Sequence, residues 1–371
     1  MNIFRRTVLW AALLPCLASP AVQAHDDDSE DAAGAVYTMS NAVDGNKILA
    51  FSRADDGSLR PAGEYATGGL GSGAGLGNQN AVVLSKDGRW LFAVNAGSNQ
   101  VSVFAVRRNG LVLVDTVDSG GVRPVSVTAD RDVLYVLNAG SDNITGYQLN
   151  RRGKLTPLPA STRPLSGAGT GPAQISFSPD GDLLAVTEKA TNRIDIYVVG
   201  EDGLATGPSV HASVGQTPFG FAFDRRGRLL VSEAAGGAFE ASSVSSYTVT
   251  EDGGLQPISA AVPTTETAAC WVVITGNGRY AYTTNAGSGS LAGYAIGRDG
   301  RLSLLNPDGR SGVTGAGSTP IDMAMSNNSR YLYTLNAGSD TVGAFRVEAD
   351  GSLQALSGVS LPDGTNGLAA R

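Results

Sequence analysis

The chain has 371 residues, which is enough for two ordinary domains. Its formal net charge of -7 becomes -9 without Arg5 and Arg6, and this acidic balance disfavours nucleic acid and anionic membranes as partners. Of its 2 cysteines, Cys16 lies in the leader segment described next, so Cys270 has no partner for an internal disulfide bond.

The first residues resemble a secretory signal peptide. Arg5 and Arg6 precede the apolar run VLWAALLPCLA, and residues 22–24 (VQA) offer a small-residue cleavage site. We therefore predict a signal peptide over residues 1–24 and a secreted or periplasmic protein. Residues 25–34 (HDDDSEDAAG) are acidic and poor in apolar side chains, which predicts a flexible arm. No other stretch is apolar enough to span a bilayer, so we expect no membrane insertion.

A four-letter motif, NAGS, begins at Asn95, Asn138, Asn285 and Asn336. Each copy follows one strand-like run and precedes another, as in a β-hairpin. Keeping this frame, weaker copies end at Ser40, Glu188 and Glu233, which makes seven copies spaced 43 to 55 residues apart. A repeat of this length made only of short strands predicts propeller blades.

Each repeat can be written as four strands, A to D. The A–B and C–D turns are short and charged, with Asx-Gly pairs that suit tight hairpins. The D–A links are long and rich in Gly, Ser and Thr, as in residues 67–80, 161–173 and 307–320, and the longest B–C link covers residues 234–243. Because these two kinds of link emerge on the same side of a four-stranded meander, we expect binding on that loop face.

The two ends of the repeat region complement each other. The pattern begins inside a B strand at Val36, and the final PDGTNGLAAR resembles the opening of an A strand. We therefore predict one domain over residues 35–371, in which the C-terminal strand joins the first blade and closes the ring without an exposed edge.

The segment GPAQISFSPDGDLLAV (residues 171–186), the NAGS hairpins and the EDG or RDG turns resemble the seven-bladed lactonase propeller family. This family includes 6-phosphogluconolactonase-like proteins and carboxymuconate cycloisomerases, and it is related to YVTN-repeat surface proteins. The resemblance covers about residues 35–371. It implies an all-β fold with seven four-stranded antiparallel blades.

The same resemblance implies a catalytic motif that this chain carries only in part. Enzymes of the family have Gly-Pro-Arg-His at the start of an inner strand. Here Gly171 and Pro172 match, but Ala173 and Gln174 replace the arginine and the histidine. Because glutamine does not titrate, a general acid or base at this position is absent.

Residues that break a sevenfold repeat are candidates for chemistry. Glu188 and Glu233 occupy the motif position at which four other blades have asparagine. Two carboxylates at a channel mouth can act as acid and base, or as oxygen ligands for a divalent cation. The alternative is that both are solvated strand ends, paired with Lys189 or Arg193.

The starts of the A strands give a second ring of predicted substrate-binding residues: Asn80, Arg123, Gln174, Phe219, Trp271 and Asp322. Arg123 falls in the arginine column of the family, one blade early, and can hold a carboxylate or phosphate. Its alternative role is an ion pair with Asp322 across the channel. Phe219 and Trp271 form either an apolar wall for a ligand or part of the core.

Two functions fit this sequence. The first is a lactone hydrolase or cycloisomerase that acts on a small anionic lactone in the central channel, with Arg123 binding the anion and Glu188 and Glu233 in catalysis. The second is a non-catalytic propeller whose loop face binds a protein, glycan or polymer. We expect no cofactor, with a divalent cation at the channel mouth as the alternative, and a monomer.

Overall fold

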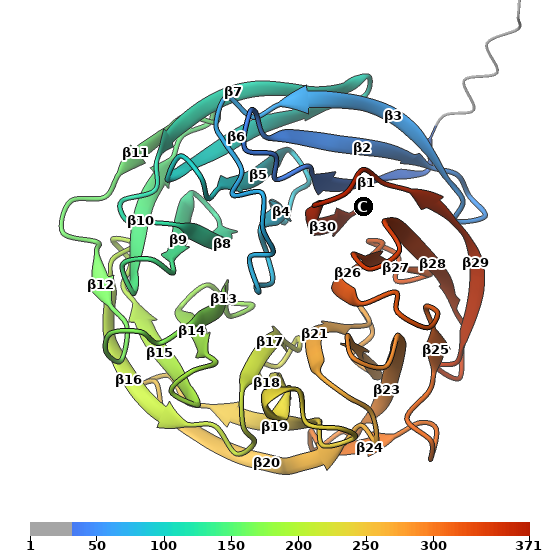
Figure 1. Ribbon diagram of the computed structural model, residues 1–371. Coiled ribbons are helices and arrows are strands. Elements are labelled where there is room, and N and C mark those ends of the chain that lie inside the picture. Colours follow the sequence, from blue (N-terminus) through green and yellow to red (C-terminus); the bar gives the residue numbers. More distant parts are fainter. Residues whose placement is uncertain (1–31) are drawn as a thin grey trace, which may run out of the picture. The chain divides into compact units, whose positions relative to one another are not determined.

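The computed structural model describes residues 32–371, which form seven antiparallel sheets arranged in a ring (Figure 1). The predicted signal peptide and most of the predicted acidic arm lie outside the described residues. The sheets are the blades of a seven-bladed β-propeller, as the repeat predicts. Each blade has four strands, and blades 3 and 6 carry one additional short strand each.

From the channel outward, the strands of the first four blades are as follows: blade 1, β30 (Asn366–Ala370), β1 (Gly34–Met39), β2 (Lys47–Arg53) and β3 (Leu59–Ala66); blade 2, β4 (Val82–Leu84), β5 (Trp90–Asn95), β6 (Gln100–Arg107) and β7 (Gly110–Asp118); blade 3, β8 (Pro124–Asp130), β9 (Val133–Asn138), β10 (Asn143–Leu149) and β11 (Leu155–Pro157), with β12 (Arg163–Pro164) beside β10; blade 4, β13 (Pro172–Phe177), β14 (Leu183–Glu188), β15 (Arg193–Val199) and β16 (Ala205–Ala212).

The remaining three blades are built in the same order: blade 5, β17 (Pro218–Phe223), β18 (Leu229–Glu233), β19 (Ser243–Val249) and β20 (Leu255–Pro263); blade 6, β21 (Ala269–Ile274), β22 (Tyr280–Asn285), β23 (Ser290–Ile296) and β24 (Leu302–Leu304), with β25 (Gly312–Val313) beside β23; blade 7, β26 (Pro320–Met325), β27 (Tyr331–Asn336), β28 (Thr341–Val347) and β29 (Leu353–Ser360).

The second strand of each blade is buried along its length because both of its faces pack against neighbouring blades. All six residues of β5, β14 and β22 are buried. The outer strands alternate instead, as in β3, where most residues after Leu59 are exposed. The continuous apolar runs before each NAGS motif are therefore explained by packing on both faces.

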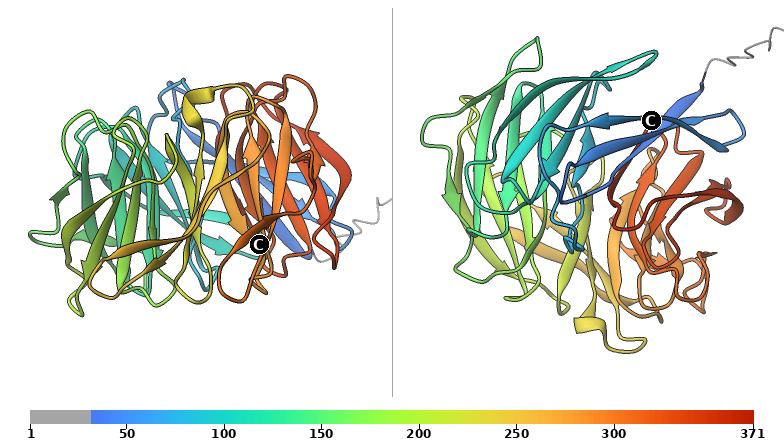
Figure 2. Two further views of the ribbon diagram at one scale, coloured as in Figure 1. Left: turned by 90° about the horizontal axis from the view of Figure 1, so that it is seen from below. Right: turned by 45° about the horizontal axis from the view of Figure 1, so that its top comes forward.

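The two kinds of connection separate as expected. In the side view of Figure 2, loops project from both rims of the ring, and the short helix η1 (Ala235–Gly237) in the β18–β19 link protrudes from one of them. The tight turns use glycines with positive φ, such as Gly88 (φ 67°) and Gly181 (φ 84°), a conformation in which a Cβ is unfavourable.

The ring is closed by its C-terminal strand. In the register of β30 and β1, Leu368 faces Thr38 and Ala370 faces Val36. Residues far apart in sequence thus complete one sheet, and no blade lacks its inner strand. Within residues 32–371 no helix is long and apolar enough to cross a membrane.

Candidate functional site

Glu188 ends β14 and is fully buried. Its Oε1 accepts a hydrogen bond from the backbone N–H of Ser166 (2.9 Å), and its Oε2 accepts from the hydroxyls of Ser166 (2.5 Å) and Thr191. Ser166 belongs to the link that enters blade 4, so this carboxylate ties the link to the blade. Its role as acid or base stays a prediction.

Glu233 lies in the corresponding place in blade 5 and is also fully buried. Its carboxylate accepts from the backbone N–H of Gly215 (3.0 Å) and from the hydroxyls of Ser243 and Ser245, the latter at 2.6 Å. Burial raises its pKa, and these donors oppose the shift. In the described part of the chain Glu188 and Glu233 share no hydrogen-bond partner, and each carboxylate is held by the link that enters its own blade.

Gln174 and Asp322 lie in the channel wall, where each contacts the backbone of an adjacent inner strand. Gln174 accepts from the N–H of Phe221 (2.7 Å) and donates to the Phe221 carbonyl (3.0 Å). Asp322 accepts from the N–H of Met323 (2.7 Å) and of Leu368 (3.1 Å), and burial raises its pKa well above the usual value. Both side chains join one blade to the next.

The strand register corrects the alignment of Arg123. Pro124 pairs with Asn138 and Pro172 pairs with Glu188, so Arg123 corresponds to Gly171 and not to the arginine column at Ala173. Both inner strands have the same register shift after this proline, so aligning Pro124 with Pro172 gives the correct correspondence. Arg123 has a φ of 55° and donates its N–H to Asn99 Oδ1 (2.7 Å).

Residues from the inner strands and from the loops beside them nevertheless meet at the loop-face mouth of the channel. The Phe219 and Trp271 rings have centroids 4.9 Å apart and planes inclined at 54°. The Lys189 ammonium lies 4.7 Å from the centre of the Phe219 ring, a cation–π contact. We call Arg123, Lys189, Phe219, Cys270 and Trp271 the mouth cluster.

Lys189 carries a positive charge in the mouth cluster, and its surroundings change its pKa. Burial is the main cause that lowers its pKa to about 8, and the positive charge of Arg123 lowers it further. Burial also raises the pKa of the neighbouring Cys270 thiol to about 12, which leaves it protonated. Within residues 32–371 neither Arg123 nor Lys189 forms an ion pair with a carboxylate.

From the sequence, Lys189 was considered only as an ion-pair partner of a solvated Glu188 or Glu233. That alternative is wrong, because both glutamates are fully buried and no ion pair with Lys189 forms within residues 32–371. A signal for another role is nevertheless present at Lys189. Lys189 follows the motif position, where the corresponding residues of five blades are alanine: Ala96, Ala139, Ala234, Ala286 and Ala337.

Of the predicted residues, the structure brings Arg123, Phe219 and Trp271 to the mouth. Asn80 starts the adjoining blade and donates to the carbonyl of Ile175 (3.3 Å) in the channel wall.

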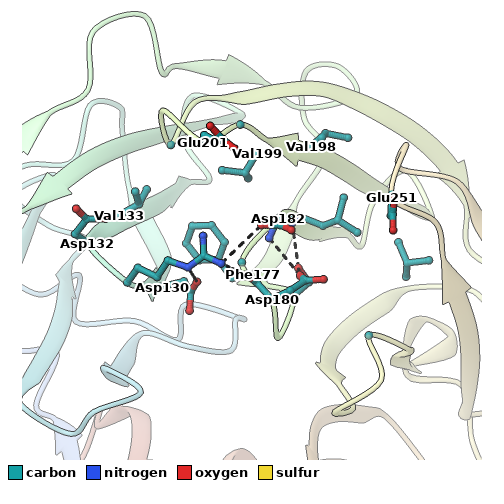
Figure 3. Close-up of a pocket in the computed structure, with 18 of the residues that line it drawn as sticks. Asp130, Asp132, Val133, Phe177, Asp180, Asp182, Val198, Val199, Glu201 and Glu251 are labelled. Atoms are coloured by element: carbon teal, nitrogen blue, oxygen red, sulfur yellow. Dashed lines mark hydrogen bonds and ion pairs between the residues drawn. The ribbon is translucent and has the colours of Figure 1, made fainter.

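A pocket of about 750 Å³ lies on the opposite face, among the tight turns of blades 3, 4 and 5 (Figure 3). None of the eight predicted residues lines it. Asp130, Asp180 and Asp182 gather on one side of it, and Glu201 and Glu251 line it farther out. Arg131 and Arg226 also line the pocket, but the carboxylates outnumber them. The excess of negative charge disfavours an anionic ligand there, which favours the mouth cluster as the candidate site. In the described part of the chain, no group of three or more His, Cys, Asp or Glu is placed to hold a metal ion.

Comparison with known proteins identifies the family. The model of the family described as "Lactonase, 7-bladed beta-propeller" matches residues 45–166, 159–269 and 237–368. The chain belongs to this lactonase family. The family resemblance noted from the motifs is therefore confirmed, and so is the all-β seven-bladed fold.

Similar members of the lactonase family are named as 6-phosphogluconolactonases. One from Serratia proteamaculans is 25% identical over 278 residues, 72% of this chain and 80% of the relative. Another from Yersinia enterocolitica is 21% identical over 307 residues, 81% of this chain and 74% of the relative.

Solved structures show the same fold. A putative 6-phosphogluconolactonase from Bacteroides fragilis superposes with a TM-score of 0.74 at 19% identity, covering 93% of this chain and 100% of that one. A periplasmic gluconolactonase from Pseudomonas aeruginosa gives 0.71 at 17% identity, covering 90% and 99%.

Proposed function

We propose that this lactonase-family propeller is secreted or periplasmic and hydrolyses a small anionic sugar lactone at its loop-face mouth. The observation that carries the proposal is the Lys189 ammonium, which lies 4.7 Å from the centre of the Phe219 ring and, like the exposed Arg123, has no carboxylate partner in residues 32–371. Unneutralised cations in a partly buried site attract an anion. Phe219 and Trp271 are only 9% and 3% exposed and belong to the core, so they pack beside Lys189 and do not form a wall for the ligand.

The chemistry divides between the two cations. Arg123, which is exposed, can bind a phosphate or carboxylate in a bidentate fork. Lys189 is mostly protonated at neutral pH because its pKa is about 8. As an ammonium it can donate to the lactone carbonyl and stabilise the negative charge that develops on that oxygen when water attacks.

The test is hydrolysis of 6-phosphoglucono-1,5-lactone and of glucono-1,5-lactone, followed as acid release above the spontaneous rate. The phosphorylated lactone is the substrate class suggested by the names of the curated relatives, and the unphosphorylated one by the periplasmic gluconolactonase. Since the mouth is cationic, we expect a higher kcat/KM for the phosphorylated lactone.

Two charge-removing variants locate the site. Arg123→Gln and Lys189→Gln should each lower kcat/KM for the phosphorylated lactone by about tenfold or more, because each loses a charge-assisted hydrogen bond. Arg346→Gln is the matched control, since Arg346 pairs with Glu348 on the outer part of blade 7 (2.7 Å). Unchanged kinetics in both mouth variants would place the activity elsewhere.

The second candidate function is a non-catalytic binding propeller. It is favoured by the replacement of the Arg-His pair with Ala173 and Gln174, because both polar atoms of the Gln174 amide are hydrogen-bonded to the Phe221 backbone. Hydrolysis no faster than the spontaneous rate for both lactones would support this function and reject the first.

If hydrolysis is found, Glu188→Gln and Glu233→Gln test the predicted acid and base roles. A fall in kcat with an unchanged Tm is expected for a catalytic carboxylate.

A further inference from the structure

The link between β3 and β4 enters the centre of the ring, as the blue loop in Figure 1 shows. Near its end, Leu76, Asn78 and Gln79 are buried, with exposed fractions of 4%, 1% and 5%. Gly75 and Gly77, on either side of Leu76, are exposed. We call residues 75–80 the plug.

The second half of the plug is anchored to three other blades. Gln79 donates its N–H to the Ala173 carbonyl (3.1 Å), and its side chain both donates to the Val272 carbonyl (3.0 Å) and accepts from the Val272 N–H (3.2 Å). Asn78 donates its side-chain N–H to the Val125 carbonyl. These contacts reach blades 4, 6 and 3, so residues 78–80 form a fixed brace across the channel.

The plug also occupies two donors of the mouth cluster. The Lys189 ammonium donates to the Gly77 carbonyl, and the Trp271 indole N–H donates to the Asn78 carbonyl (2.6 Å). A carbonyl carries no net charge, so Lys189 keeps its attraction for an anion. In this arrangement, however, the acceptor bonded to the Lys189 ammonium is the Gly77 carbonyl of the same chain.

The segment at Gly75–Gly77 differs from the brace. On its N-terminal side the link is held by Asn41, which accepts from the Ser72 N–H (2.9 Å) and donates to the Ala74 carbonyl (2.9 Å). Between Ala74 and Asn78, the contacts are the Lys189 bond to Gly77 and the burial of Leu76. A Cβ at Gly75 would meet nothing within 4 Å, so this glycine faces open space.

We propose that Gly75–Gly77 is a gate whose Gly77 carbonyl stands in for the carbonyl oxygen of the substrate, and that it swings outward to let a lactone reach Lys189. This inference rests on the proposed function for the identity of the ligand. Leu76 holds the gate closed, because its side chain must leave the core when the segment moves. Residues 78–80 stay in place.

The gate is tested without substrate, by measuring how fast acetic anhydride acetylates Lys189, with mass spectrometry as the readout. Leu76→Ala should speed the acetylation of Lys189 about tenfold, since the lost burial of a leucine shifts the open fraction by that order. Leu361→Ala is the matched control, because Leu361 is similarly buried (9% exposed) in the β29–β30 link. It should leave the Lys189 rate unchanged.

A second variant acts in the opposite direction. Gly75→Ala fits the open space and reduces backbone freedom, so it should slow the acetylation of Lys189 about two- to threefold. The rates at Lys47, Lys86 and Lys154 report whether each variant keeps the native fold. Equal Lys189 rates in wild type, Leu76→Ala and Gly75→Ala, with these three lysines unchanged, overturn the gate.

Lactone kinetics separate the gate from the proposed function. If Leu76→Ala exposes Lys189 and also lowers KM for 6-phosphoglucono-1,5-lactone, both are supported. If Lys189 is exposed as expected but no variant hydrolyses either lactone, the proposed function fails and the gate stands. If hydrolysis is found and Lys189 labelling is identical throughout, the gate fails and the proposed function stands.

Discussion

Asp195 forms a buried pair with Glu188 in blade 4. It lies on β15 and is fully buried. Burial is the main cause that raises its pKa to about 8, and the nearby Glu188 carboxylate adds to the shift. Asp195 is therefore protonated in the folded protein at neutral pH, and Glu188 can accept its proton in a hydrogen bond. Within residues 32–371 neither Asp195 oxygen has a hydrogen-bond partner.

This pair predicts a pH dependence of stability. In the unfolded chain Asp195 ionises near its usual value of 3.8, whereas in the folded protein it does so near 8. Between these values the folded state binds one more proton, so this group makes stability fall as pH rises from about 4 to 8 and has no further effect above that. Asp195→Asn keeps a donor toward Glu188 but cannot ionise. Its Tm relative to wild type should therefore rise between pH 5 and pH 8.

The control for this measurement is Asp363→Asn, because Asp363 is exposed. Its Tm curve should run parallel to that of wild type from pH 5 to pH 8. A parallel curve for Asp195→Asn as well would show that Asp195 contributes no such slope. Thermal unfolding followed by circular dichroism is sufficient for the comparison.

At the residue scale, the sequence predicted which positions are unusual better than it predicted what they do. Glu188 and Glu233 break the repeat, but their partners Ser166 and Gly215 lie in links whose course no local pattern specifies. Arg123 reaches the mouth for a reason unrelated to the arginine column. The place of Lys189 in the mouth cluster was missed because its burial against Phe219 depends on the plug, and contacts between distant segments have no periodicity.

At the level of the element, neighbouring blades are joined by a repeated hydrogen bond. A buried tyrosine in the second strand of one blade donates to the glycine carbonyl of the third turn in the next blade. The pairs are Tyr135 with Gly203 (2.9 Å), Tyr282 with Gly351 (2.8 Å), and Tyr333 with Gly57 (2.9 Å). The turn glycines carry a positive φ, as at Gly57 (89°), and so bring the carbonyl close to the tyrosine.

Tyr333→Phe tests this contact where the ring closes, between blades 7 and 1. The variant leaves a buried carbonyl without its donor, which costs about 1 to 3 kcal/mol of unfolding free energy. Urea unfolding measures the change. Tyr65→Phe is the control, since its hydroxyl makes only a long contact to the Ala62 carbonyl (3.5 Å). Equal losses in the two variants would mean that the interblade bond adds nothing.

The strands and turns were predictable because local interactions within each repeat determine them. The last residue of the second strand is Asn95, Asn138, Glu188, Glu233, Asn285 or Asn336 in six blades, as the motif frame indicates. Turn chemistry and alternation of apolar residues specify such strands within one repeat. The plug has no counterpart in the other repeats, so repeat comparison shows only that residues 67–80 form a long link.

For the whole molecule, the decisive contact is the one between its two ends. Beyond the pairing of β30 with β1, the Arg371 N–H donates to the Ala35 carbonyl (2.9 Å), and Arg53 Nε donates to the Arg371 carbonyl (3.2 Å). Leu368 supplies the N–H that one oxygen of Asp322 accepts. Removing β30 therefore affects both blade 1 and the wall of blade 7.

A variant that ends at Gly364 should be strongly destabilised because β1 becomes an unpaired edge and the carboxyl group of Asp322 loses one of its two donors. We expect Tm to fall by at least about 10 °C, since several kcal/mol are lost in a protein of this size. A synthetic peptide of residues 362–371 should restore most of the loss by adding the missing strand. A peptide of the same composition in scrambled order is the control. Unchanged Tm after truncation, or equal recovery with the scrambled peptide, would show that β30 does not hold the ring closed.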